Sequence, residues 1–370
     1  MIVNEYADDK SPVSKLCLEL EQHLEEQGSR AKTIYISKRY IPGGLSPRRL
    51  GNLLLLHILF PLILLYFRVM TIKSREGLVV ISTTNPPLIH WTTALAGLML
   101  RIPSLLWYMD AHPDLECLSL KKKRFFRLAD FLSFLDKKII RLFQAYIALD
   151  EAMAVNLRTK ACKPVFVANP WATYVTPSKP LALKDWEKTL KLVYAGNYGA
   201  AHDLSPFLQY LKGQPVIIKS QLSISFVGMP APIGTALRDR FLEVGVAAEF
   251  LPRFSSFSKL LQFLHRFHFG IVSLKDCQRG LACPSKAFTY VSQGIPLCYV
   301  GPNKTLTDSL LEKGWGISYT QLADVIESGD YLENIRQNQG FSYPSVREES
   351  LGIMMSVLKG MQRGEQVWEQ

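Results

Sequence analysis

The stretch "LVYAGNYGAAHDL", residues 192–204, joins an apolar strand to a glycine turn and decides the fold class. Apolar and aromatic residues lead into Gly196, Asn197 and Gly199, and residues 200–203 then predict the start of a helix. A strand that passes through such a turn into a helix often holds an anion, since backbone N–H groups and the helix dipole point the same way. A turn that only needs glycine geometry is an equally good interpretation. The stretch is neither G-x-G-x-x-G nor a P-loop, so dinucleotide and ATP binding lose support.

The alternation of strands and helices predicts two similar domains. Most of the strands are apolar throughout, which indicates parallel sheets covered on both faces. A segment with Pro, Ser and Thr interrupts the pattern and predicts a boundary near residue 180. We therefore expect two doubly wound, Rossmann-like α/β domains facing a cleft, at residues 1–178 and 188–343, and an extra helix within 344–370. Ligands of such sheets bind at the carboxyl ends of the strands, where the glycine turn lies.

Composition and charge narrow the class of partner. With 48% hydrophobic and 20% charged residues, the 370-residue chain can bury a large core, which argues against a disordered protein. Residues 1–175 hold 23 Lys and Arg against 15 Asp and Glu, so +8 of the net +11 lies there. This charge favours an acidic partner: an anionic membrane surface, a phosphorylated substrate or nucleic acid. We expect no nucleic acid partner, because the basic residues do not interleave with aromatics in a recognisable module.

Cysteine spacing and the apolar segments indicate in which cellular compartment the protein is expected. The six cysteines form no C-x-x-C pair and no zinc spacing, which favours reduced thiols in the cytoplasm. The N-terminal "MIVNEYADDK" is too polar for a secretory signal. The apolar run at residues 53–70 contains Pro61 and extends for 15 residues before Arg68, whereas a spanning helix needs about 20. We expect a buried or interfacial helix there, with a spanning helix as the alternative.

A second stretch, "CPSKAFTYVSQGIPL" at residues 283–297, predicts a cation at a helix start. Pro284 and Ser285 can begin a helix, which puts Lys286 in the first turn, where the helix dipole disfavours positive charge. That placement is explained if Lys286 faces an anion. A solvated surface lysine is the alternative.

Seven motifs in order resemble those of GT-B glycosyltransferases, above all the retaining, metal-independent bacterial enzymes that build surface polysaccharides from nucleotide-sugars. They are "STTNPPL", "WYMDAHPD", "ALDEAMAVNL", "VANPW", "YAGNYGAAHDL", "FVG" and "PSKAFTYVSQGIP", and the likeness covers residues 1–360. It implies that the first domain binds the acceptor, the second binds the nucleotide-sugar, and the last helix crosses back to the first domain. No D-x-D triplet occurs, so the chemistry needs no metal and no cofactor besides the nucleotide-sugar substrate.

The same resemblance assigns site residues by position. Asp110 and His112 would lie beside the sugar ring as catalytic residues, although each could simply shape a turn. Lys286 would be the cation for the diphosphate. The full set of implied donor-binding residues is Gly196, Asn197, Gly199, His202, Asp203, Arg279, Ser285, Lys286 and Thr289.

Three positions depart from the family pattern. Ala200 replaces an arginine, and Leu281 and Thr289 replace two glutamates, the second of which usually holds the nucleotide ribose. Arg279 lies near enough in sequence to replace the lost cation. These changes motivate an alternative, a degenerate GT-B subunit that binds sugar, lipid or a partner enzyme without catalysis. Another GT-B sugar enzyme, such as an epimerase, is the third interpretation.

The leading hypothesis is a glycosyltransferase that moves a sugar, with retention, from a nucleotide-sugar such as a UDP-sugar. The apolar run and a basic helix expected at residues 121–141 favour a lipid-linked acceptor, with a glycan as the other possibility. The protein is then expected in the cytoplasm, attached peripherally to the inner face of the cell membrane.

Overall fold

The chain folds into two compact α/β units. The computed structural model describes residues 2–4, 12–35, 47–74, 77–84, 88–115, 117–118, 124–171, 189–328 and 343–363. Unit 1 contains Met1–Thr173, Gly280–Cys283 and Arg347–Gln370, and unit 2 contains Tyr174–Arg279 and Pro284–Val346. Each unit is built on a six-stranded sheet in which neighbouring strands pair in parallel, as the apolar strands predicted.

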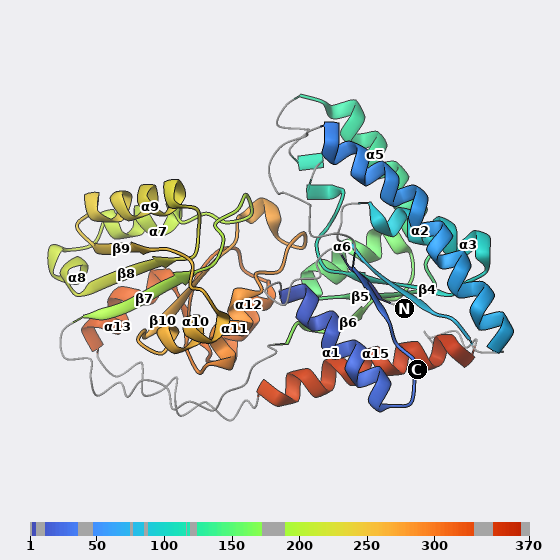
Figure 1. Cartoon of the computed structure of the whole chain (residues 1–370). Coiled ribbons are helices and arrows are strands. Elements are labelled where there is room, and N and C mark those ends of the chain that lie inside the picture. The colour runs from blue at the N-terminus through green and yellow to red at the C-terminus, as the bar shows by residue number, and fades with distance from the viewer. Residues whose placement is uncertain are drawn as a thin grey trace. The chain divides into compact units, whose positions relative to one another are not determined.

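The sheet of unit 1 has the strand order β2-β1-β3-β4-β5-β6. Its strands are β1 (Ile2–Asn4), β2 (Thr33–Tyr35), β3 (Val80–Thr83), β4 (Ser104–Tyr108), β5 (Ala145–Ala148) and β6 (Phe166–Val167). Its helices are α1 (Pro12–Glu26), α2 (Pro47–Ser74), α3 (Ile89–Leu100), α5 (Phe126–Ile140), α6 (Glu151–Ala161) and α15 (Tyr343–Arg363). Figure 1 shows α2, α3 and α5 on one side of this sheet, with α1 and α15 on the other. Every residue of β3, β4 and β5 is buried, as expected of strands covered on both faces.

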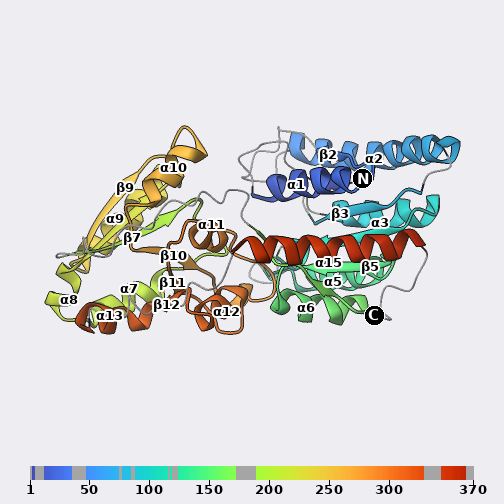
Figure 2. The ribbon, with the colours of Figure 1, turned by 90° about the horizontal axis from the view of Figure 1, so that it is seen from below.

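The sheet of unit 2 has the strand order β12-β11-β10-β7-β8-β9. Its strands are β7 (Leu190–Ala195), β8 (Leu222–Val227), β9 (Ala247–Leu251), β10 (Phe269–Ser273), β11 (Leu297–Val300) and β12 (Gly316–Ser318). Its helices are α7 (Ser205–Lys212), α8 (Val216–Ser220), α9 (Ala231–Glu243), α10 (Phe257–Leu264), α11 (Lys286–Ser292), α12 (Leu306–Glu312) and α13 (Leu322–Ser328), and two 3-10 turns are η2 (Asp276–Gln278) and η3 (Tyr319–Gln321). Figures 1 and 2 show that α7 and α9 cover the face of the sheet opposite to α10 and α11.

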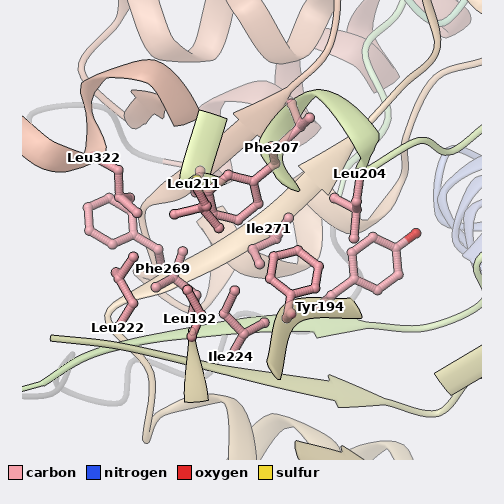
Figure 3. Close-up of a cluster of buried hydrophobic side chains, with 14 of the residues drawn as sticks. Leu192, Tyr194, Leu204, Phe207, Leu211, Leu222, Ile224, Phe269, Ile271 and Leu322 are labelled. Carbon is pink, nitrogen blue, oxygen red and sulfur yellow. The ribbon is translucent and has the colours of Figure 1, made fainter. Parts of the chain in front are cut away.

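The strand order of unit 2 reverses between β7 and β10. The chain runs from β7 outward to β8 and β9, and then returns through β10 on the other side of β7. Ligands of doubly wound sheets bind outside the carboxyl ends of the strands at such a reversal. The core beneath this edge is a cluster of fully buried side chains that includes Tyr194, Phe207 and Phe269 (Figure 3). The carboxyl ends of the strands in unit 2 are therefore supported by a close-packed hydrophobic core.

The prediction that residues 200–203 begin a helix is wrong, because α7 begins at Ser205. The carbonyls of Ala200 and Ala201, which a helix would engage, instead accept hydrogen bonds from Lys275, from its Nζ at 2.7 Å and its backbone N–H at 2.9 Å. Pro206 in the first turn suits the later start, since proline has no N–H to leave unpaired there. The glycine turn is consequently followed by a loop, not directly by a helix N-terminus.

The apolar run forms α2, which contains Pro61. Within the described residues, none of the helices combines the length and the hydropathy that a membrane crossing requires. The basic helix expected at residues 121–141 is shorter in the structure: α5 begins at Phe126 and ends at Ile140, Arg124 lies in a turn before it, and residues 121–123 lie outside the described part of the chain. The last helix, α15, belongs almost entirely to unit 1.

Candidate functional site

The turn after β7 leaves backbone exposed at the carboxyl edge of unit 2. Gly196 has a φ of +102°, which a residue with a side chain rarely adopts, and its N–H donates to the Val227 carbonyl at 2.8 Å. Gly199 has an ordinary negative φ, but a Cβ placed there would meet no atom within 4 Å. Asn197 and Gly199 are exposed. The turn therefore has a fixed backbone with open space above it.

Lys275 fixes the loop that follows the turn, and the sequence reasoning missed it. Besides its two hydrogen bonds to Ala200 and Ala201, it directly follows Leu274, the buried residue after the end of β10. Ala200 occupies the position where the family pattern has an arginine, so a cation reaches this position from the segment that follows β10. The signal was present in "SLK", a lysine two residues beyond a strand end at the reversal point. Arg279, the expected replacement, is exposed at the end of η2.

Helix α11 is locked beside β7 by Tyr290. The Tyr290 hydroxyl accepts from the Ala195 N–H at 2.7 Å and donates to the Val193 carbonyl at 3.2 Å. Gly270 on β10 makes room for this ring, since a Cβ there would come within 2.3 Å of it. The exposed Ser285 precedes the helix without a side-chain cap, and Lys286 is its first residue, as predicted. The fixed helix thus sets where Lys286 points.

The ammonium group of Lys286 lies against the glycine turn. Its Nζ is 3.5 Å from the Asn197 carbonyl oxygen and 3.6 Å from the centroid of the Tyr194 ring. Burial lowers its pKa well below the ordinary value for lysine. Among the described residues, no carboxylate forms a salt bridge with it. A half-buried cation without a counter-ion, next to exposed backbone, is chemically suited to an anionic ligand.

His202 is a neutral hydrogen-bonding group between two lysines. Its Nδ1 lies 2.7 Å from the Ser273 carbonyl oxygen, so Nδ1 carries the proton and Nε2 is left as an acceptor. Burial, followed by the charges of Lys286 and Lys275, lowers the pKa of His202 to about 4. At neutral pH it therefore adds no charge and can accept one hydrogen bond.

Asp203 lies just before the start of α7, whereas Thr289 lies on α11 near Lys286. An Asp203 carboxylate oxygen accepts from the Ser205 N–H at 2.8 Å, at the start of α7. An acidic group already stands at this helix N-terminus, so the idea that the α7 dipole holds an anion is not supported. Thr289 is half-buried and lies one helical turn after Lys286, which puts both residues on the same face of α11.

A cavity of about 540 Å³ adjoins the same loop within unit 2. Asp203, Lys275, the exposed Cys277 and Tyr319 contribute to its walls, and Lys286 does not. Lys275 therefore borders both the loop of the glycine turn and this cavity.

The predicted catalytic residues lie in unit 1, in the loop after β4. The backbone N–H of Asp110 donates to the Thr84 hydroxyl at 3.0 Å. Asp110 also forms an isolated antiparallel bridge with Ala282, and the Ala111 N–H donates to the Leu281 carbonyl at 2.8 Å. Gly280–Cys283 thus leaves the sequence neighbourhood of Lys286 and packs in unit 1, so Leu281 uses its backbone to hold the Asp110 loop.

A buried ionic network supports the same loop. Lys160 on α6 forms salt bridges with Asp114 at 2.6 Å and with Asp136 on α5 at 2.8 Å. His90 on α3 lies 3.0 Å from Asp136, and Asn156 bonds the Gly280 carbonyl at 3.2 Å. Burial lowers the pKa of His90 and favours its neutral form.

Lys160 and Asp136 stabilise each other in their ionised forms. Burial opposes the charge of Lys160, but Tyr108, Asp136 and Asp114 outweigh it and raise the pKa of this lysine. Burial likewise opposes the charge of Asp136, but His90 and Lys160 hold its pKa below the ordinary range. The loop that carries Asp110 and His112 is consequently tied to α6 and α5 through ion pairs, and the hydrogen bond between His90 and Asp136 extends the network to α3.

The predicted site residues thus fall into one group in each unit. Gly196, Asn197, His202 and Lys286 come together in unit 2, whereas Asp110 and His112 lie in unit 1. Within the described residues, no three His, Cys, Asp or Glu side chains are arranged to hold a metal ion.

Comparisons with known proteins identify the fold of the chain. No family model and no curated protein matches the chain. Among solved structures, the lipopolysaccharide outer-core galactosyltransferase WaaB in its apo form is 9% identical, with a TM-score of 0.56, over 95% of this chain and 98% of that one. Anabaena HepE in complex with UDP and glucose is 13% identical, with a TM-score of 0.59, over 96% and 98% of the two chains.

A protein provisionally described as a UDP-N-acetylglucosamine 2-epimerase, from Listeria monocytogenes, is also similar. It is 12% identical, with a TM-score of 0.51, over 98% of this chain and 96% of that one. Likeness at these identities concerns the fold, which supports unrelated activities. Two doubly wound units and full-length similarity to WaaB and HepE show that this chain has the GT-B glycosyltransferase fold.

Proposed function

We propose that the protein is a glycosyltransferase that uses a nucleotide-sugar, such as a UDP-sugar, as its donor. The observation that carries the proposal is Lys286, a half-buried cation without a carboxylate partner among the described residues, 3.5 Å from the exposed glycine turn. The diphosphate would bind between this ammonium group and the backbone of the turn from Asn197 to Gly199, with Ser285 beside them, while the Gly196 N–H stays bonded to the Val227 carbonyl. The Thr289 hydroxyl would lie at the ribose. HepE, which shares the fold, has been seen with UDP and glucose.

Transfer would break the bond between the anomeric carbon and the diphosphate oxygen and form a bond to an acceptor hydroxyl oxygen. The hydroxyl proton would leave to the departing diphosphate, whose negative charge Lys286 and the turn stabilise without a metal. Lys275 would support this charge through the loop, and the exposed Arg279 could add to it. In the proposed assignment His202 accepts a hydrogen bond from the sugar. Asp203 would hold the loop in place.

On the acceptor side we propose that Asp110 and His112 act in catalysis beside the sugar ring, with retention of configuration. Their loop is held rigidly by Thr84, by Gly280–Cys283 and by the Asp114–Lys160 ion pair, as a catalytic constellation requires. The acceptor would be lipid-linked or a glycan. Unit 1, which holds most of the positive charge, would attach the protein peripherally to the inner face of the cell membrane.

The second candidate is a degenerate subunit that binds without catalysis, and Thr289 in place of a glutamate favours it. Against it stands Lys275, whose Nζ contacts the Ala200 carbonyl, so the missing arginine does not leave this position without a cation. The likeness to the Listeria protein keeps an epimerase as the third candidate.

A thermal-shift screen with UDP, GDP, ADP and their sugars tests the proposal. We expect one nucleoside diphosphate to raise the melting temperature, and Lys286→Ala to abolish most of the shift. Incubation of that nucleotide-sugar with membrane extract should then release the nucleoside diphosphate. Binding without release or epimerisation would favour the degenerate subunit, and no binding of any nucleotide at millimolar concentration would overturn the donor site.

A further inference from the structure

Three helices of unit 1 present large apolar side chains to solvent. The six most informative are Leu62, Tyr66 and Ile72 on α2, Met99 on α3, and Phe131 and Phe134 on α5, with exposed fractions from 57% to 82%. We call these six residues the apolar face. Exposing single apolar residues is normal for soluble proteins, but a large contiguous patch marks an interaction surface.

The three helices are neighbours, so their exposed side chains form one surface. Helix α3 packs against both α2 and α5, and Figure 1 shows all three on the same side of the sheet. Buried residues of α2, Phe60 and Leu64, pack against the core with Ile89 of α3. These core positions anchor α2 from its buried side.

Positive charge adjoins the apolar face along α5 and at the end of α3. Arg101, Arg127, Lys137 and Lys138 are exposed at or near it, and Lys138 Nζ lies 5.5 Å from the centroid of the Phe134 ring. The segments α2 and α3 contain no Asp or Glu, and on α5 Asp130 is exposed whereas Asp136 is buried. Exposed aromatics next to Lys and Arg are typical of helices that lie in the interface of an anionic membrane.

We propose that the apolar face inserts its side chains into the interfacial region of an anionic bilayer. A second copy of the chain is a poorer occupant, because a symmetric contact would bring the same lysines and arginines of both copies together. The proposed membrane attachment would be fully sensitive to salt if it depended on positive charge alone. Insertion of the apolar face adds a part of the binding energy that salt does not screen. It also rests on the proposed function in one respect, since it makes an amphiphilic, lipid-linked acceptor the substrate class.

The buried network gives this surface a link to the predicted acceptor loop. Asp136 lies on α5, one helical turn or less from Phe134 and Lys137, and Lys160 joins it to Asp114, two residues after His112. His90 connects α3 to the same aspartate. Insertion of α3 and α5 would therefore hold the loop of Asp110 and His112 at a fixed place relative to the lipid surface.

Insertion can be measured directly with a tryptophan reporter in the full-length protein. We expect Met99→Trp to shift its emission to the blue with vesicles of phosphatidylglycerol and phosphatidylcholine, and to be quenched by bromine on the acyl chains. The matched control is Val216→Trp on α8 of unit 2, which is 77% exposed and should show neither change. Wild-type protein supplies the background from the native tryptophans. Vesicle binding without quenching at Met99→Trp would overturn the proposal.

Loss of the face should remove the salt-resistant part of binding. Replacing Phe131 and Phe134 together by Ser is expected to lower partition onto these vesicles about ten- to a hundredfold, from the apolar area no longer buried. Val216→Ser with Ile217→Ser, which removes comparable exposed apolar groups elsewhere, should leave partition unchanged. Binding that disappears completely in about 1 M salt would contradict insertion. So would a stable dimer in which the Met99→Trp reporter is buried without lipid.

Failure of the insertion proposal can be distinguished from failure of the proposed glycosyltransferase function. Insertion without any nucleotide binding would support the apolar face and reject the glycosyltransferase. Nucleotide-sugar turnover with a soluble acceptor, by protein that ignores anionic vesicles at low salt, would do the reverse.

Discussion

The ammonium group of Lys286 lies over the ring of Tyr194, 3.6 Å from its centroid. The same tyrosine donates its hydroxyl to the Asn197 carbonyl at 3.2 Å, so one residue supports both the turn and the cation beside it. A cation over an aromatic face is stabilised by about 0.5–2 kcal/mol, less than a paired anion gives in a half-buried place. The arrangement holds the Lys286 side chain in position, and its positive charge is left available to bind an anionic ligand.

Lys286→Ala should weaken nucleoside diphosphate binding by about 1.5–3 kcal/mol, or roughly 13- to 150-fold, as expected for a hydrogen bond to a charged group. Isothermal titration calorimetry of the variant and the wild type measures the difference. Lys212→Ala, at the exposed end of α7, removes a lysine away from the turn and should have no effect. Equal affinity in all three proteins would reject the diphosphate assignment.

His202 should remain neutral far into the acidic range. Its pKa of about 4 lies below the ordinary 6.5, so the unfolded chain binds this proton first as the pH falls. His202 therefore contributes full stability above pH 6.5, and this contribution is lost as the pH falls from 6.5 toward 4. Bound diphosphate should raise the pKa, because it compensates the lysine charges. NMR titration of the imidazole nitrogens checks both points, and a midpoint near 6.5 in the free protein would contradict them.

Thr289→Val keeps the side-chain shape and removes one neutral hydrogen bond, worth about 0.5–1.5 kcal/mol. If the hydroxyl meets the ribose, nucleotide affinity should fall about 2- to 13-fold in calorimetry. Thr289→Glu restores the residue of the family pattern and should raise affinity where the pocket still suits a carboxylate. A drop in melting temperature with no gain in affinity would mean that the surroundings no longer accept the charge.

Lys160→Met should destabilise unit 1 by about 3–5 kcal/mol, because it leaves Asp114 and Asp136 as uncompensated buried or half-buried charges. Denaturant unfolding followed by circular dichroism provides the measurement. Lys137→Met on the exposed side of α5 is the matched control and should change stability by less than about 0.5 kcal/mol. Similar small effects of the two substitutions would show that the network does not hold the loop.

Gly280→Ala should destabilise the protein by about 1–3 kcal/mol. Gly280 has a φ of +71°, and a Cβ there would lie 2.7 Å from the Ala152 carbonyl oxygen, so the segment would have to move away from α6. Gly352→Ala, in the middle of α15 where a Cβ meets nothing within 4 Å, should instead stabilise by about 0.5–1 kcal/mol. The opposite signs in thermal unfolding distinguish a close approach from ordinary glycine flexibility.

The sequence by itself determined the features that depend on near neighbours along the chain. Apolar strands such as β4 and β10 indicated parallel sheets, and Pro284 with Ser285 predicted the start of α11 within one residue. Gly196 predicted a turn, and its positive φ is a backbone conformation that only a residue without a side chain readily adopts. These signals are local, since strand periodicity, helix starts and positive φ angles involve residues a few positions apart.

Only the tertiary structure decided how distant residues combine. The false helix at residues 200–203 had acceptable local propensity, but Lys275, 75 positions from Ala200, captured the carbonyl oxygens that the helix would have engaged. Lys160 likewise contacts Asp114 and Asp136 from a different helix, and Ala282 pairs with Asp110, although the two residues are far apart in the sequence. Such contacts depend on which strand ends the fold brings to one edge, and that order follows from packing of the whole sheet, which no local pattern encodes.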